Sequence, residues 1–236
     1  MTNPTTKPDG RSLGFRLIRR GLFGLLVLGA LVFGSAGTLK FWQGWAFLVV
    51  NFTVTFGFCA YFYKHDPQLL ERRMLRKEKI GAQKIIMLMG KLLSVPLYML
   101  PGFDHRFGWS RGSTGPVPWW LTLLALLLVP AGYLVFFWVL KTNRFAAAII
   151  QVEAGQTVTD TGLYHLVRHP LYSGGIVLWL AVPLVLGSFV ALPAFALSIP
   201  LIVFRLLNEE KFLRRELPGY AEYCRQTRYR LIPFVW

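Results

Sequence analysis

The chain of 236 residues is 54% hydrophobic and only 16% charged, with a formal net charge of +15 at pH 7. Its mean hydropathy of +0.47 excludes an ordinary water-soluble domain and indicates segments that lie in lipid. The two cysteines, Cys59 and Cys224, fall in elements of different character, so neither a disulfide framework nor a cysteine-based metal site is predicted.

The apolar residues gather in six runs, each close to the roughly 17–25 residues that cross a bilayer core of about 30 Å. In chain order the runs are 21–37, 41–63, 85–103, 119–140, 171–187 and 189–207. A helix satisfies its backbone hydrogen bonds within itself, which makes it the element expected in hydrocarbon at this composition. We therefore predict an all-α integral membrane protein with about six (five to six) transmembrane helices, the first four of them within 13–142. The first run is interpreted as a retained span rather than a signal peptide.

The basic residues alternate with the predicted spans. Most of the 26 Lys and Arg residues fall before the first run, between the second and third, between the fourth and fifth, or after the sixth. The positive-inside rule places these segments in the cytoplasm, which predicts that both termini are cytoplasmic. Topology and contact with anionic lipid account for the charge, so no nucleic acid is predicted as a partner. The expected location is the plasma (inner) membrane in a bacterium or the endoplasmic reticulum in a eukaryote.

The first cytoplasmic segments differ in character. Residues 1–12 contain several Pro, Gly and Thr residues and are predicted to form a disordered head. After the second run, Asp66 followed by Pro67 is a typical helix start. Leucines and arginines then alternate at amphipathic spacing, which predicts an interfacial helix on anionic lipid. His65 and Asp66 are alternatives as substrate contacts, although nothing local requires that role.

The loop after the third run contains Asp104 and His105, which together suggest a pair of metal ligands. Structural metal sites usually need four ligands and catalytic sites three. Because no third ligand is nearby, we interpret the pair as part of a hydrogen-bonded loop network, and no metal is predicted.

The C-terminal region, 143–236, begins with a polar stretch that differs from the spans. Between 148 and 160, β-branched residues flank Ala154 and Gly155, which is the pattern of a short hairpin. We predict a cytoplasmic hairpin here, followed by the last two spans and a tail. Only Ser188 separates these two spans, so they are expected to form a tight antiparallel pair.

The most informative stretch is Gly162-Leu-Tyr-His-Leu-Val-Arg-His-Pro-Leu-Tyr-Ser-Gly174, which is polar, aromatic and turn-forming and leads into an apolar run. Beyond it come Arg205, Glu209-Glu210, Pro218-Gly219-Tyr220, Tyr223 and the terminal Tyr229-Arg-Leu-Ile-Pro233. This order resembles the isoprenylcysteine carboxyl methyltransferase family and its relatives, the phospholipid methyltransferases. The resemblance covers 151–236, whereas the first half is similar only in its hydrophobic spans.

The resemblance implies S-adenosylmethionine as the cofactor, bound by the cytoplasmic C-terminal region. It implies cofactor contacts at Gln151, Gln156, Thr157, Val158, Thr159, Tyr164, His169, Pro170, Leu171, Tyr172 and Glu209. Carboxylates and aromatic faces suit such a cationic cofactor. Arg205 corresponds to the residue that holds the substrate carboxylate, a role that suits a bidentate guanidinium. Arg205 and Glu209, four residues apart on one helix face, are the predicted catalytic pair.

These residues also have a purely structural interpretation. Taken singly, His169 and the tyrosines at 164, 172, 220 and 223 are more typical of an interfacial belt than of a cofactor site. Glu210 is predicted to be a solvated partner of nearby arginines. Only the whole set, in this order and between spans, favours the functional interpretation.

The predicted function is methyl transfer from S-adenosylmethionine to a lipophilic acceptor, with a carboxylate such as an isoprenylcysteine-like group preferred. The predicted partners are the bilayer and a lipophilic small molecule or prenylated substrate. Three alternatives stay open: N-methylation of a phospholipid amine, a prenyl-lipid or sterol reductase, and a non-catalytic membrane scaffold or transport subunit. The sequence determines neither the acceptor nor the oligomeric state.

Overall fold

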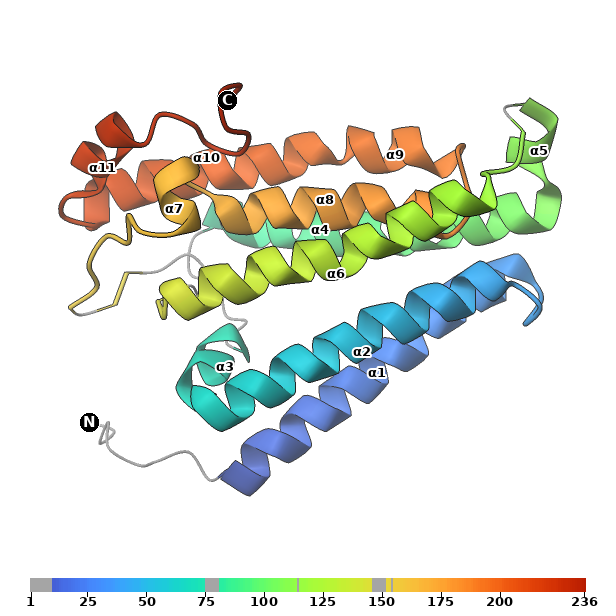
Figure 1. Ribbon diagram of the computed structural model, residues 1–236, viewed down its shortest axis with the longest axis horizontal. Helices are drawn as coiled ribbons and strands as arrows, with labels where there is room; N and C mark the ends of the chain where they lie inside the picture. Colours follow the sequence, from blue (N-terminus) through green and yellow to red (C-terminus); the bar gives the residue numbers. More distant parts are fainter. Residues whose placement is uncertain (1–9, 75–80, 114, 146–151, 154) are drawn as a thin grey trace.

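The computed structural model describes residues 10–74, 81–113, 115–145, 152–153 and 155–236, and their regular secondary structure is entirely helical. Long helices run back and forth along one axis, with α3, α7 and α11 at one end and α5 at the other (Figure 1). The helices are α1 (Gly10–Ala36), α2 (Trp42–His65), α3 (Pro67–Met74), α4 (Gly81–Phe107), α5 (Trp109–Ser113), α6 (Trp119–Thr142), α7 (Leu163–Leu166), α8 (Pro170–Val185), α9 (Ala191–Leu197), α10 (Ile199–Glu216) and α11 (Tyr220–Gln226).

Five segments of the described chain are long and apolar enough to cross a membrane. They are Leu13–Ala36, Trp42–His65, Gln83–Phe107, Trp119–Thr142 and Ala191–Glu216. The apolar helix α8 has 16 residues, so it is about 24 Å long at a rise of about 1.5 Å per residue. It therefore falls short of the bilayer core of about 30 Å. The predicted all-α membrane class with five to six spans is confirmed.

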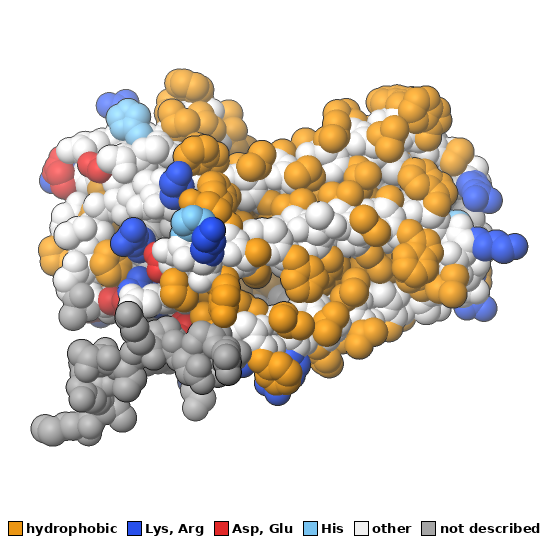
Figure 2. All heavy atoms as spheres, turned by 60° about the horizontal axis from the view of Figure 1, so that its bottom comes forward, with side chains coloured by type: hydrophobic (Ala, Val, Ile, Leu, Met, Phe, Trp, Pro, Cys, Tyr) orange, Lys and Arg blue, Asp and Glu red, His pale blue; other side chains and the backbone are white. Residues whose placement is uncertain are grey.

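Apolar side chains cover the outside of the long helices. Figure 2 shows them spread over the middle of one face, while most charged side chains lie toward its two ends. The exposed set includes Leu26 on α1, Val49 on α2, Leu92 on α4 and Leu127 on α6. Such a belt is the surface expected of helices in lipid.

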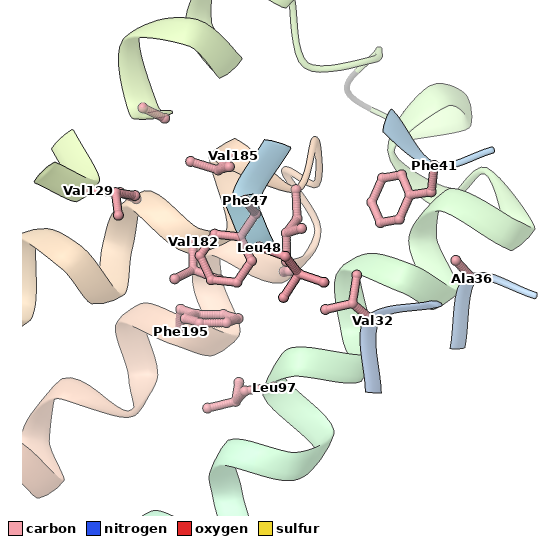
Figure 3. Close-up of a cluster of buried hydrophobic side chains, with 14 residues drawn as sticks. Val32, Ala36, Phe41, Phe47, Leu48, Leu97, Val129, Val182, Val185 and Phe195 are labelled. Carbon is pink, nitrogen blue, oxygen red and sulfur yellow. The ribbon is translucent and has the colours of Figure 1, made fainter. Parts of the chain in front are cut away.

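The long helices pack around a main apolar core and approach one another closely at glycines. Phe47, Val182 and Phe195 converge in this core from α2, α8 and α9 (Figure 3). At the crossing of α6 and α8, a Cβ on Gly132 would lie 2.5 Å from the Cγ of Leu178, and one on Gly174 would lie 2.9 Å from the Cβ of Val135. Small residues that allow close approach are typical of helix contacts in membranes. This crossing fixes the start of α8, where the candidate site lies.

The end that carries α5 is held by a buried carboxylate. Asp104 accepts hydrogen bonds from the backbone N–H of Ser110, at 2.7 Å, and from the hydroxyls of Ser110 and Ser188. The network joins α4 and α5 to the turn between α8 and α9. His105 instead stacks on Phe41, with ring centroids 4.3 Å apart. The predicted hydrogen-bonded network is confirmed for Asp104, but the predicted loop is wrong, because Asp104 and His105 both lie in the last turn of α4.

The last span is interrupted between α9 and α10. The indole N–H of Trp179 donates to the Ser198 hydroxyl at 2.7 Å and lies 3.2 Å from the Phe195 carbonyl oxygen. Pro200 follows and has no backbone N–H to continue the helical ladder. The side chain of Trp179 therefore supplies a donor at this break. The tight antiparallel pair predicted for the last two runs is present, with a turn at Gly187 whose φ is +71°.

Two predictions for the cytoplasmic segments differ from the structure. Residues 10–12, assigned to the disordered head, already belong to α1, while 1–9 lie outside the described residues. The helix extends past the apolar run because it packs against α3, where Arg16 pairs with Glu71 at 3.0 Å. The leucines of α3, Leu69 and Leu70, are buried in a cluster with Phe62 of α2 instead of facing lipid.

The hairpin predicted for 148–160 is wrong for the residues described. Residues 152–153 and 155–160 contain no strand, although Gly155 does form a turn with a φ of +76°. The apolar side chains of Val152 and Val158 pack against the cluster around Tyr220 and Tyr223. These two valines therefore pack against the tyrosine cluster instead of pairing in a strand.

Candidate functional site

A cavity of about 270 Å³ lies at the end of the helices that carries α3, α7 and α11. It brings together the predicted residues Gln156, Thr157, Val158, Thr159, Tyr164, His169, Pro170, Leu171, Tyr172, Arg205 and Glu209. They come from the loop after α6, from α7, from the start of α8 and from α10. Gln151, the remaining predicted contact, lies outside the described residues.

A hydroxyl joins the two predicted catalytic residues. Tyr172 donates to Glu209 Oε2 at 2.6 Å and accepts a hydrogen bond from Arg205 Nε at 3.1 Å. Pro170 starts α8 in the way proline suits a first helical position, and this sets Tyr172 in the first turn, facing α10. The one-turn spacing of Arg205 and Glu209 puts both on the cavity side of α10, as predicted.

Gln83 of α4 holds Arg205 from the opposite direction and was missed by the sequence interpretation. Its side chain is fully buried, with Oε1 at 3.3 Å from Arg205 Nη1 and Nε2 at 3.4 Å from the Arg205 carbonyl oxygen. Its place at the polar start of an apolar helix was the available signal, since polar groups there usually face a partner. The contact links the N-terminal half of the chain to the site.

Tyrosines form one wall of the cavity. Tyr223 donates to the backbone oxygen of Tyr164 at 2.7 Å, and the side-chain amide of Asn143 donates to the Tyr164 hydroxyl at 3.1 Å. Burial raises the pKa of Tyr164 to about 12 and also raises the pKa values of Tyr220 and Tyr223. These hydroxyls therefore stay neutral at physiological pH, and the wall presents uncharged rings to a ligand.

A buried ion cluster lies directly behind the cavity. Glu210 is 4% exposed, with Oε1 at 3.0 Å from Arg168 Nη1 and 3.5 Å from His169 Nε2, and Oε2 at 3.2 Å from Arg230 Nε. The prediction that arginines surround Glu210 is confirmed, but the prediction that it is solvated is wrong. The C-terminal tail folds over it and removes it from water.

Backbone hydrogen bonds fix this tail along the start of α8. The N–H groups of Arg168 and His169 donate to the carbonyl oxygens of Tyr229 and Arg230, each at 2.9 Å. The Ser173 hydroxyl donates to the Leu231 carbonyl oxygen at 2.7 Å. The segment around His169 therefore has a structural role, because it holds the C-terminal tail. His169 also lines the cavity.

A second missed residue, Arg73, reaches the cavity from α3. Desolvation of the buried guanidinium lowers the pKa of Arg73 from its ordinary value. Its neighbour Arg72 ties α3 to the loop after α6 by donating to the Arg144 carbonyl oxygen at 2.8 Å and lying 3.6 Å from Glu153. The adjacent arginines in the amphipathic stretch were the signal, but they were interpreted as lipid contacts.

The cavity presents two kinds of chemistry. Glu209 and the tyrosine rings suit a positively charged group. Arg73 and Arg205 suit a carboxylate or another planar anion. The volume is close to the lower end of the roughly 300–1,000 Å³ typical of small-molecule sites. A ligand with both signs of charge, or two ligands of opposite charge, would match this lining.

Comparisons with known proteins find two similarities, one of them to the region that contains most of the cavity residues. Residues 120–218 match the family model described as phospholipid methyltransferase, which confirms the predicted resemblance, although the match begins before the predicted range 151–236 and ends at 218. The chain is also 32% identical over 90 residues to the delta(14)-sterol reductase TM7SF2 of Mus musculus. That similarity covers 37% of this chain and 22% of the reductase, so the chain corresponds to about a fifth of the reductase's length.

Proposed function

We propose that this chain, whose C-terminal half is similar to the phospholipid methyltransferases, is a membrane-embedded S-adenosylmethionine-dependent methyltransferase. Its acceptor in this proposal is a lipophilic carboxylate, such as an isoprenylcysteine-like group. The similarity of residues 120–218 to a methyltransferase family supports the reaction class. The observation that carries the proposal is the pair of hydrogen bonds by which the Tyr172 hydroxyl joins Arg205 to Glu209. These bonds hold a guanidinium and a carboxylate side by side in one cavity.

The residues of the cavity fit the proposed cofactor. Glu209 would hold its positive end, and the neutral rings of Tyr164 and Tyr172 would lie against it. The loop 156–159 lines the same cavity. When bound, S-adenosylmethionine supplies the methyl group on a sulfonium, a leaving group that needs little further activation. The protein's contribution is therefore mainly to position the two substrates and exclude water.

Arg205 would orient the acceptor. Gln83 and Tyr172 hold its guanidinium from two sides, so the side chain is fixed before an acceptor arrives. A fixed guanidinium can bind a carboxylate through two parallel hydrogen bonds and direct one oxygen toward the methyl group. Tyr172 keeps Arg205 next to Glu209, which would place acceptor and cofactor close together. Preorganisation of this kind lowers the entropic cost of reaction.

The direct test is to incubate the purified full-length chain with S-adenosylmethionine labelled on its methyl group and a total lipid extract. Label in a base-labile methyl ester is the expected result, because esters hydrolyse readily in base. Label in a base-stable phospholipid amine would instead identify an N-methyltransferase. Boiled protein and the Arg205→Ala variant are the controls. No transfer to any lipid would contradict the proposal.

The similarity to the sterol reductase supports a second candidate, a reductase acting on a prenyl lipid or sterol. A reductase of that type requires a nicotinamide cofactor, whereas a methyltransferase does not. Calorimetric titration with S-adenosylmethionine and with reduced nicotinamide dinucleotide phosphate separates the two. Binding of the nicotinamide cofactor alone would favour the reductase, and binding of neither would favour a non-catalytic membrane subunit.

We also propose that the cavity and both termini face the cytoplasm, because most basic residues lie in segments at that end. An impermeant thiol reagent added outside intact cells should label a cysteine placed at Ser113, the last residue of α5, and not one placed at Thr157. The native cysteines are replaced first. Labelling at Thr157 alone would reverse the orientation and separate the cavity from cytosolic cofactor.

A further inference from the structure

A second cavity lies mainly in the part of the chain that precedes the residues matched by the family model. It has a volume of about 620 Å³ and shares no lining residue with the cavity described above. Its lining comes mainly from α1 and α2, with Tyr133 of α6 on one wall. Most of the lining is apolar, including Leu17, Ile18, Phe52 and Phe56. The walls therefore suit a hydrocarbon chain.

A polar triad interrupts these apolar walls. The Thr55 hydroxyl is 2.9 Å from the Tyr133 hydroxyl, which in turn donates to Asn51 Oδ1 at 3.1 Å. All three residues line the cavity. The side-chain nitrogen of Asn51 has no hydrogen-bond partner in the described part of the chain. Polar residues within membrane-spanning helices commonly mark a cavity or a ligand path, so the triad offers a polar contact inside a lipid-like pocket.

The rim of this cavity is basic. Arg20 lines it, is exposed, and donates to the Met74 carbonyl oxygen at 3.4 Å. That contact holds the guanidinium beside α3, at the same end of the bundle as the first cavity. Arg19 is the neighbouring residue and is also exposed. An anionic headgroup complements Arg20, which lines the cavity, whereas the ammonium group of a zwitterionic headgroup would be brought close to its positive charge.

From the basic rim, the polar triad and the apolar walls, we propose that this second cavity binds one anionic glycerophospholipid. Its phosphate lies at Arg20, an ester carbonyl accepts a hydrogen bond from Asn51, and one acyl chain lies against Leu17, Phe52 and Phe56. The volume falls within the range of small-molecule sites, roughly 300–1,000 Å³. This site is independent of the methyltransferase proposal, because it uses none of the residues of the first cavity.

The test measures lipid retained by the purified full-length chain. The protein is placed in nanodiscs made of an equimolar mixture of phosphatidylglycerol and phosphatidylcholine. It is then extracted with mild detergent, and native mass spectrometry identifies the lipid that stays bound. One retained phosphatidylglycerol per chain is the expected result. Equal retention of phosphatidylcholine, or no retained lipid, would overturn the proposal.

Two pairs of variants locate the lipid. Arg20→Gln should lower phosphatidylglycerol retention about fivefold, equivalent to the roughly 1 kcal/mol that one basic residue contributes at an anionic surface. Arg19→Gln is the matched control, because Arg19 is exposed but does not line the cavity. Ala60→Trp fills the cavity and should abolish retention, while Ala30→Trp, at an exposed position of α1 outside the lining, should not.

The controls keep the result decisive. Equal losses in Arg20→Gln and Arg19→Gln would show diffuse attraction to the basic surface and overturn the assignment of Arg20. Equal behaviour of Ala60→Trp and Ala30→Trp would place the lipid elsewhere on the belt. Melting temperatures of all four variants confirm that each is folded, and Arg20→Gln, at an exposed side chain, tests the site even if Ala60→Trp does not fold.

Discussion

Glu209 and Glu210 are neighbours in sequence, but the two sides of α10 on which they lie have opposite surroundings. Glu209 lines the cavity, and its one hydrogen-bond partner in the described part of the chain is the neutral hydroxyl of Tyr172. Glu210 is buried among Arg168, His169 and Arg230. The charge of Glu210 is thus balanced within the protein, whereas that of Glu209 faces a cavity.

This difference separates a carboxylate buried among positive charges from one that faces a cavity. A buried ion cluster holds elements together, and its members cannot be removed singly without leaving an uncompensated charge. A carboxylate that faces a cavity and is paired with a neutral donor retains its attraction for a cation. Variants on the two sides of α10 should therefore fail in different ways, those near Glu210 in folding and those near Glu209 in binding or turnover.

The largest expected effect is on the buried side. Glu210→Gln should lower the free energy of unfolding by about 3–5 kcal/mol, the cost of breaking a buried ion pair from one side, because Arg168 would lose its carboxylate. Chemical denaturation in detergent measures this. Glu216→Gln, an exposed position on the same helix, is the control and should change little. A Glu210→Gln variant as stable as the parent would remove the distinction between the two sides.

A slightly smaller effect is expected on turnover. Arg205→Ala should lower kcat by about 10²–10³, a factor typical of losing one preorganised hydrogen-bond donor in an active site, because the acceptor carboxylate is no longer oriented. Cofactor affinity should stay nearly unchanged. Methyl-transfer kinetics measure both quantities, with Arg214→Ala on the exposed side of α10 as the matched control. Loss of cofactor affinity equal to the loss of turnover would contradict the separate roles of Arg205 and Glu209.

A smaller change tests the hydroxyl between these two residues. Tyr172→Phe removes two hydrogen bonds but keeps the ring, so kcat/KM should fall by a factor that corresponds to about 0.5–1.5 kcal/mol. The melting temperature should change little, because the packing of the ring on α8 is retained. Tyr229→Phe, outside the cavity lining, provides the comparison. An unchanged kcat/KM would show that the Tyr172 hydroxyl does not align Arg205 with Glu209.

Features that depend on residues close together in the sequence could be predicted, whereas contacts between distant segments could not. The spans depend on local apolar runs, and the spacing of Arg205 and Glu209 depends on helix geometry, so both were predictable. Arg73 reaches the cavity from α3, and Gln83 contacts Arg205 from α4, through tertiary packing that no local pattern encodes. The same reason explains the errors at Glu210, which the folded tail covers, and at Val158, which packs on α11 instead of pairing as a strand.

Of the two neighbouring glutamates, only Glu209 is proposed to hold a cationic cofactor. Calorimetric titration of the parent chain, Glu209→Gln and Glu210→Gln with S-adenosylmethionine tests this difference. Glu209→Gln should weaken binding by about 1–3 kcal/mol, the scale of one charged hydrogen bond, with a melting temperature near that of the parent. The folded fraction of Glu210→Gln should bind nearly as the parent does. Unaltered affinity in Glu209→Gln would show that Glu209 does not hold the cofactor.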